Sequence, residues 1–76
     1  MMKNTNEFII RAYGRMELAM MYSPDITPPS AYRKLCRWID RCPGLKQKLK
    51  RIGYSPLTRQ FTPLQVKMIV EHLGEP

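Results

Sequence analysis

The chain has 76 residues, 43% hydrophobic and 25% charged, which is the composition of one small globular domain and excludes a disordered or fibrous protein. No apolar run approaches the roughly 18 residues that a bilayer-spanning helix needs, so we expect neither a membrane segment nor a secretory leader. One histidine and six carboxylates leave little material for catalysis, and we expect a non-enzymatic protein without metal, cofactor or small-molecule substrate.

The net charge of +7 is concentrated in one region. The stretch from Arg33 to Arg51 holds eight of the 13 basic residues and one of the six acidic ones, so its excess charge equals that of the whole chain. A positive field of this kind favours a polyanionic partner such as nucleic acid. The alternative is a solvated basic face that keeps a small protein soluble.

The beginning of the chain divides into a tail and an arm. Residues 1–7 are polar, and we expect a flexible N-terminus there, followed by a single helical domain over residues 8–76. Phe8 to Tyr13 alternates in part and contains β-branched residues, which predicts a short strand or extended arm. Gly14 then interrupts it.

A first helix is predicted from Arg15 to Tyr22. Leu18, Ala19, Met21 and Tyr22 fall on one side of it, and Met16 and Met20 on the other. Ser23-Pro24-Asp25 ends this helix, because a proline disfavours helical geometry in the residue before it.

The second predicted helix has the clearest apolar stripe. Ala31, Leu35, Trp38, Ile39 and Cys42 fall within an arc of about 100°. Thr27 or Pro28 is the expected N-cap, and Pro43-Gly44 closes the helix. We expect Trp38 at the centre of the core, with Cys42 buried too.

The cysteine spacing indicates free thiols. Cys36 and Cys42 lie six positions apart on one helix, or about 9 Å along its axis. A disulfide requires Cα atoms within about 7 Å. Reduced cysteines favour a cytoplasmic protein.

Two further helices are expected in the last third of the chain. Leu45, Leu49 and Ile52 predict a short third helix with Gly53 as the residue that follows its C-cap. Ser55 to Gln60 is expected to be a linker. A capping box is predicted at Thr62-Pro63-Leu64-Gln65, with Phe61 and Val66 as a hydrophobic staple and Val66, Ile69, Val70 and Leu73 as the buried stripe.

The outward face of the second helix is the candidate nucleic-acid site. Ser30, Arg33, Arg37 and Arg41 lie opposite the apolar arc, with Lys34 alongside, while Lys46, Lys48, Lys50 and Arg51 follow on the third helix. Arginine presents a planar fork of donors that suits guanine edges and phosphates. A basic helix preceded by a shorter one resembles a helix-turn-helix, although the connection from Ser23 to Pro28 exceeds the usual three or four residues.

A protein partner is the competing expectation. Met16, Met20, Leu64 and Met68 lie outside the predicted core stripes and predict either an exposed patch for a partner or a homodimer, or a second buried layer under the N-terminal arm. Tyr32 flanks the stripe of its helix, where its hydroxyl is in reach of a ligand or phosphate. Binding to an anionic membrane is disfavoured, because the basic helices use their apolar residues in the core.

A set of short motifs resembles a family of small bacterial proteins described as a domain of unknown function. The motifs are Tyr13-Gly14, Glu17-Leu18-Ala19, Tyr22 with Pro24, Ala31, Leu35, Trp38-Ile39, Cys42, Gly53-Tyr54, Phe61-Thr62-Pro63 and Leu73-Gly74-Glu75-Pro76. The resemblance covers nearly the whole chain from Phe8. It implies a compact, largely helical cytoplasmic protein and carries over no activity, cofactor or functional residue.

The sequence therefore predicts a mainly α, single-domain bundle of about four short helices, helix-turn-helix-like, with a short extended N-terminal segment. The expected function is a small DNA-binding module or accessory regulator whose basic helix face contacts double-stranded DNA. The alternative is a protein-interaction adaptor or small homo-oligomer with no nucleic-acid role.

Overall fold

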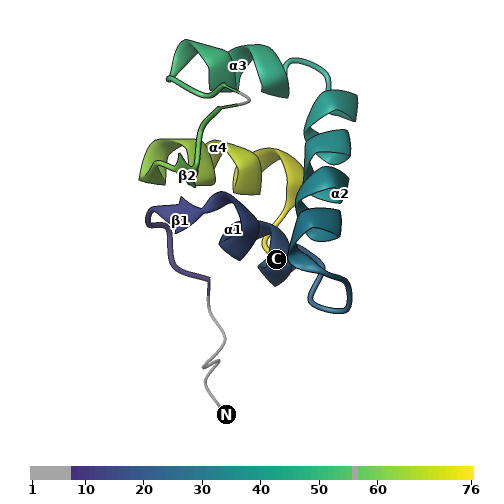
Figure 1. Ribbon diagram of the computed structural model, residues 1–76. Helices are drawn as coiled ribbons and strands as arrows, with labels where there is room; N and C mark the ends of the chain where they lie inside the picture. Colours follow the sequence, from purple (N-terminus) through teal and green to yellow (C-terminus); the bar gives the residue numbers. More distant parts are fainter. Residues whose placement is uncertain (1–7, 56) are drawn as a thin grey trace.

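The computed structural model describes residues 8–55 and 57–76, and these form four helices and a two-stranded sheet (Figure 1). The order is β1 (Tyr13–Gly14), α1 (Arg15–Tyr22), α2 (Pro28–Arg41), α3 (Leu45–Arg51), β2 (Gln60–Phe61) and α4 (Pro63–Leu73). The mainly α small domain is confirmed. The flexible tail predicted for residues 1–7 lies outside the described residues. In the part of the chain described, no helix has the length and apolarity to cross a membrane.

The helices are arranged as a stack with one crossing element. In Figure 1, α3, α4 and α1 lie one above the other, and α2 runs across all three. The buried apolar side chains lie between these layers: Tyr13, Leu18, Ala19, Ala31, Leu35, Ile39, Leu45, Leu49, Tyr54, Phe61, Val66 and Ile69. Because α2 faces three helices at once, its apolar stripe is the common wall of the core.

The small sheet joins the segment before α1 to the segment before α4. β1 and β2 are antiparallel, with Tyr13 opposite Phe61 and Gly14 opposite Gln60. The sequence predicted a longer strand or arm from Phe8 and assigned Gln60 to a linker. Strand pairing depends on a partner distant in sequence, which local alternation does not reveal.

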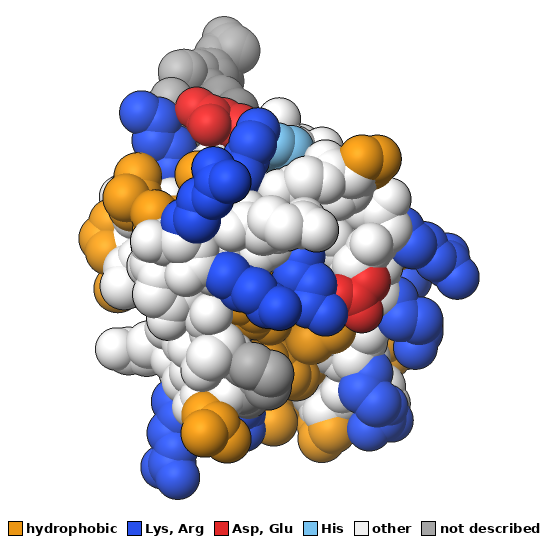
Figure 2. All heavy atoms as spheres, turned by 90° about the horizontal axis from the view of Figure 1, so that it is seen from above, with side chains coloured by type: hydrophobic (Ala, Val, Ile, Leu, Met, Phe, Trp, Pro, Cys, Tyr) orange, Lys and Arg blue, Asp and Glu red, His pale blue; other side chains and the backbone are white. Residues whose placement is uncertain are grey.

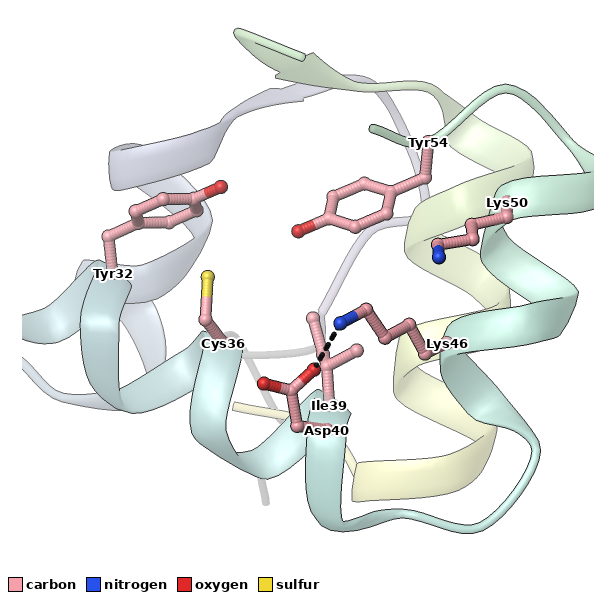
Figure 3. Close-up of a pocket in the computed structure, with 7 residues that line it drawn as sticks. All are labelled: Tyr32, Cys36, Ile39, Asp40, Lys46, Lys50 and Tyr54. Carbon is pink, nitrogen blue, oxygen red and sulfur yellow. Dashed lines mark ion pairs between the residues drawn. The ribbon is translucent and has the colours of Figure 1, made fainter. Parts of the chain in front are cut away.

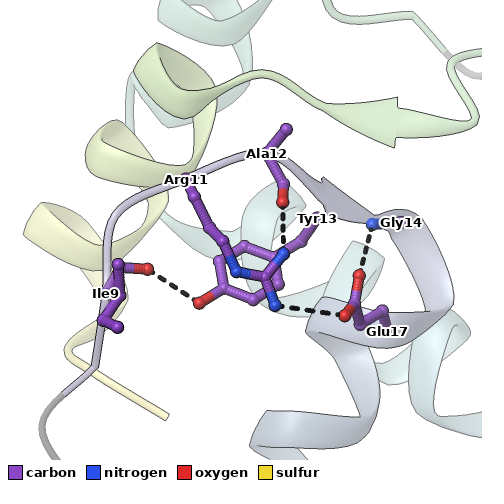
Figure 4. A network of polar contacts seen from close by, with 6 residues as sticks. All are labelled: Ile9, Arg11, Ala12, Tyr13, Gly14 and Glu17. Carbon is purple, nitrogen blue, oxygen red and sulfur yellow. Dashed lines mark hydrogen bonds and ion pairs between the residues drawn. The ribbon is translucent and has the colours of Figure 1, made fainter.

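A network of polar contacts holds the N-terminal arm against the start of α1 (Figure 4). The Glu17 carboxylate accepts hydrogen bonds from the Gly14 N–H at 3.0 Å and from the Arg11 guanidinium at 3.3 Å. That guanidinium lies 3.8 Å from the centroid of the Tyr13 ring, whose hydroxyl donates to the Ile9 carbonyl at 2.7 Å. Both hydrogen bonds hold the pKa of Glu17 below its usual value of 4.5, the bond from Gly14 more strongly.

The predicted capping box begins α4. The Thr62 hydroxyl accepts from the Gln65 N–H at 3.2 Å, and the Gln65 side-chain oxygen accepts from the Thr62 N–H at 3.0 Å. The amide nitrogen of the same Gln65 side chain donates to the Ile52 carbonyl at 3.0 Å. The cap thus also fastens α4 to the end of α3, where Gly53 has the predicted left-handed conformation with φ of 96°.

Trp38 lies at the edge of the core, which corrects its predicted central position. Its half-buried ring meets the Tyr22 ring edge-on, with centroids 5.9 Å apart. The Tyr22 hydroxyl in turn donates to the Gly74 carbonyl, so Trp38 covers the place where α1 ends and the C-terminal segment returns. Cys42 is half-buried as well, because the neighbouring helices cover only part of the apolar arc of α2.

The buried stripes of α1 and α4 are also narrower than predicted. Met21 is 41% exposed, and Val70 and Leu73 are half-buried. The fully buried large side chains include Phe61, which stacks on Tyr54 with ring centroids 5.8 Å apart.

We predict that Phe61→Ala lowers the free energy of unfolding by about 3–5 kcal/mol, because it removes a fully buried ring and leaves a cavity. Trp38→Ala removes a half-buried ring and is expected to have a clearly smaller effect. Urea unfolding followed by circular dichroism measures both. A larger loss for Trp38→Ala would contradict this description of the core.

We also predict an acid-dependent stability that comes from Glu17. Its pKa is lowered in the folded chain, so its contribution is present above about pH 4.5 and is lost as the pH falls through the folded value. The wild-type melting temperature should therefore fall on acidification more steeply than that of Glu17→Gln. Glu71→Gln, an exposed change on α4, is the matched control and should follow the wild type.

Candidate nucleic-acid interface

The outward face of α2 carries a row of three exposed arginines, which we call the arginine row: Arg33, Arg37 and Arg41. They are spaced four residues apart and therefore share one face. At 1.5 Å per residue the row is about 12 Å long. The ion pairs found among the described residues involve none of them, so the row presents its full charge to solvent.

Ser30 and Lys34 lie beside the arginine row, and each contacts a neighbouring side chain. The Ser30 hydroxyl accepts from Thr27 at 3.0 Å and from the Arg33 guanidinium at 3.2 Å, which folds Arg33 back along the first turn. Lys34 is half-buried, and its ammonium lies 5.3 Å from the centroid of the Trp38 ring. The structure thus places both predicted residues beside the row, with their polar groups partly engaged.

The basic residues of α3 are all exposed but do not form one face with the arginine row. Lys46 and Lys50 are four residues apart and turn toward α2, whereas Lys48 is two residues from each and lies on another side of the helix. Arg51 is exposed at the last position of α3. The space-filling view shows basic side chains in separate groups, with acidic side chains beside the group at the top and the group in the middle of the view (Figure 2).

Asp40 neutralises part of this surface. Its carboxylate lies 3.1 Å from the Lys46 ammonium, and both side chains are about half exposed at 55% and 45%. An ion pair with this exposure contributes little to stability. Its effect here is electrostatic, because Lys46 is neutralised while Lys50, on the same side of α3, has no ion-pair partner among the described residues.

A pocket of about 220 Å³ opens between α2 and α3, and we call it the α2–α3 pocket (Figure 3). Tyr32, Cys36, Ile39, Asp40, Lys46, Lys50 and Tyr54 line it. Of these, the sequence indicated Tyr32 as a ligand contact and the two lysines as phosphate contacts. Cys36 and Tyr54 were missed as site residues. The spacing of Tyr32, Cys36 and Asp40 along one flank of α2 was the available signal.

The two tyrosines of the pocket keep their protons over a wide pH range. Burial raises the pKa of the Tyr54 phenol, and the neighbouring Tyr32 hydroxyl and Cys36 thiol add to the effect. Burial also raises the pKa of Tyr32. Both hydroxyls point toward the middle of the pocket, above the Cys36 sulfur (Figure 3). At neutral pH they are hydrogen-bond donors as well as acceptors.

The predicted partner surface is largely covered. Met20 and Met68 pack against the core, and Met16 is half-buried. Leu64 is 54% exposed. Within residues 8–55 and 57–76, no group of three or more His, Cys, Asp or Glu side chains is placed to hold a metal ion. Both cysteines are free thiols, as their spacing predicts.

One comparison with known proteins assigns the chain to a family. The family model described as "Domain of unknown function (DUF4248)" matches residues 9–76, which is nearly the whole chain. No curated protein and no solved structure matches the chain. The match therefore identifies a family but does not indicate a function.

We predict that Tyr54→Phe makes the protein less sensitive to alkali. In the wild type, folding raises the pKa values of Tyr32 and Tyr54 above their ordinary value of 10, so these phenols ionise at a lower pH in the unfolded chain than in the folded one. The stability that comes from keeping them neutral is therefore complete below pH 10 and is lost as the pH rises further. Removing one phenol should make this loss shallower in melting curves recorded at increasing pH. An unchanged slope would contradict the burial of this hydroxyl.

Proposed function

The chain belongs to the family of the domain of unknown function DUF4248, and we propose that it is a non-enzymatic DNA-binding module or accessory regulator that uses the outward face of α2. The observation that carries the proposal is the arginine row. Three guanidinium groups with no carboxylate partner among the described residues share one face about 12 Å long. Arginine suits both phosphate oxygens and guanine edges.

The dimensions of α2 fit a DNA groove. Its 14 residues span about 21 Å, and the major groove, at about 12 Å wide, admits one α-helix. Phosphates follow each other every 3.4 Å or so along the duplex axis of one strand, so the arginine row covers a few successive phosphates. Such contacts set the register of a protein on DNA, and base contacts then add sequence preference.

The arrangement of α1 and α2 supports this use of α2 without reproducing a helix-turn-helix. The two helices make the most extensive contact of any pair of elements, so α1 supports α2 from the inside. Five residues, Ser23 to Thr27, connect them, one or two more than in that motif. The proposal therefore depends on the exposed face of α2 and not on a motif match.

The residues of α3 would add phosphate contacts of unequal strength. Lys48, Lys50 and Arg51 are exposed and are absent from the ion pairs of the described residues. Lys46 is paired with Asp40, which lowers its contribution. Free thiols at Cys36 and Cys42 agree with a reducing compartment, so the proposal places the protein in the cytoplasm of a bacterial cell.

We predict that the protein binds duplex DNA with an affinity that falls steeply with salt, because each neutralised phosphate releases about 0.9 of a counterion. Arg37→Ala and Lys48→Ala should each weaken binding and flatten the salt dependence by about one unit. Arg33→Ala or Arg37→Ala should also relax any sequence preference, by about 1–3 kcal/mol per lost base contact. Fluorescence anisotropy at several salt concentrations gives all of these quantities.

Lys67→Ala is the matched control, because this exposed lysine lies on α4, outside the basic stretch. It should leave both affinity and salt dependence nearly unchanged. Equal effects of Arg37→Ala and Lys67→Ala would show that net charge, and not the arginine row, governs binding. A wild-type protein that does not bind DNA at low salt would refute the proposal and favour a protein partner at exposed apolar residues such as Leu64.

A further inference from the structure

The α2–α3 pocket has the size for one ring-shaped group. Its volume of about 220 Å³ exceeds the 150 Å³ or so of an engineered apolar cavity that takes up benzene. It is smaller than the roughly 300 Å³ at which pockets for drug-sized ligands begin. A single aromatic ring with one small substituent therefore fits this volume.

The walls of the pocket favour an apolar body. Ile39 is 2% exposed, and the rings of Tyr32 and Tyr54 enter from opposite sides, with the Cys36 sulfur between them (Figure 3). Tyrosine rings contact other aromatic rings favourably, edge-on or offset. A small hydrated ion such as inorganic phosphate has no apolar body to cover these walls, so it would not gain the stabilisation that comes from burying apolar surface.

The rim of the pocket favours a negative charge. Two ammonium groups, of Lys46 and Lys50, and the single carboxylate of Asp40 lie there, which leaves one positive charge in excess. Lys46 is engaged by Asp40 at 3.1 Å, whereas Lys50 takes part in no ion pair among the described residues. Protonated Tyr32 and Tyr54 hydroxyls supply hydrogen-bond donors toward the same space.

From this combination we propose that the α2–α3 pocket binds a small aromatic carboxylate, with the ring packed against the side chains of Tyr32, Tyr54 and Ile39 and the carboxylate at Lys50. The ring fills the apolar part, and the carboxylate meets the excess positive charge. This inference goes beyond DNA binding and does not depend on it. It rests on the flank of α2 that faces α3, while the proposed DNA contacts rest on the outward face.

Benzoate is the probe, titrated into the isotope-labelled full chain and followed by NMR. Saturable shifts are expected at Cys36 and Tyr54, next to the pocket, and not on the outer side of α4. Benzyl alcohol keeps the ring without the charge, and acetate keeps the charge without the ring. Both should bind more weakly than benzoate. Equal binding of benzoate and either control, or no saturable shift with benzoate, overturns the proposal.

Three variants of exposed residues test the charge at the rim. Lys50→Gln should weaken benzoate binding about tenfold, since it removes the unpaired cation. Asp40→Asn should strengthen binding several-fold, because it removes the competing carboxylate and releases Lys46. Lys48→Gln, on the same helix but outside the pocket, should change nothing. Equal effects of Lys50→Gln and Lys48→Gln would refute the assignment of the carboxylate.

The cysteines supply a second readout within one sample. Cys36 lines the pocket and Cys42 does not, and both are half-buried free thiols. Bound benzoate should slow alkylation of Cys36 and leave that of Cys42 unchanged, as peptide mass spectrometry can measure. Equal slowing of both, or of neither, contradicts binding in this pocket. Because no DNA is present, a failure here is distinct from a failure of DNA binding.

Discussion

The structure depends on one constraint, namely that the apolar stripe of α2 must serve three other helices at once. Ala31, Leu35 and Ile39 are almost completely buried, and α2 crosses the stack of α1, α3 and α4 along this line. A helix of 14 residues that uses one stripe for the core has the remaining faces free. One of them carries the arginine row, and the flank beside α3 forms a wall of the α2–α3 pocket.

The chain ends and turns hold the other elements against α2. The pairing of Tyr13 with Phe61 brings the start of α1 to the start of α4, and the Gln65 side chain joins the cap of α4 to the end of α3. Tyr54 lies in the turn after α3, where its N–H donates to the Leu49 carbonyl at 3.0 Å and its ring stacks on Phe61. The core thus fixes the position of one pocket wall, which gives the pocket a preformed shape.

Asp40 separates the two proposed uses of the basic region. Asp40 lies between the arginine row and the α2–α3 pocket, and its carboxylate pairs with Lys46. The positive charge is therefore divided between the arginine row on the outward face of α2 and the lysines at the rim of the pocket. A polyanion needs a continuous charged face of some length, whereas a small carboxylate needs one unpaired cation near an apolar surface. The same stretch of sequence offers both, because helical geometry directs neighbouring residues to different sides.

The sequence by itself determined the features that depend on neighbours along the chain. Helical spacing located the four helices, the Thr62–Gln65 pattern defined a cap, the cysteine spacing excluded a disulfide, and the arginine spacing placed three cations on one face. Only the tertiary structure decided that Trp38 lies at the edge, that Gln60 and Phe61 pair with the N-terminal arm, and that Tyr54 meets the flank of α2. A helical wheel describes the faces of one helix, but burial and pockets depend on which other elements cover those faces and at what crossing, and that follows from contacts between residues far apart in the sequence.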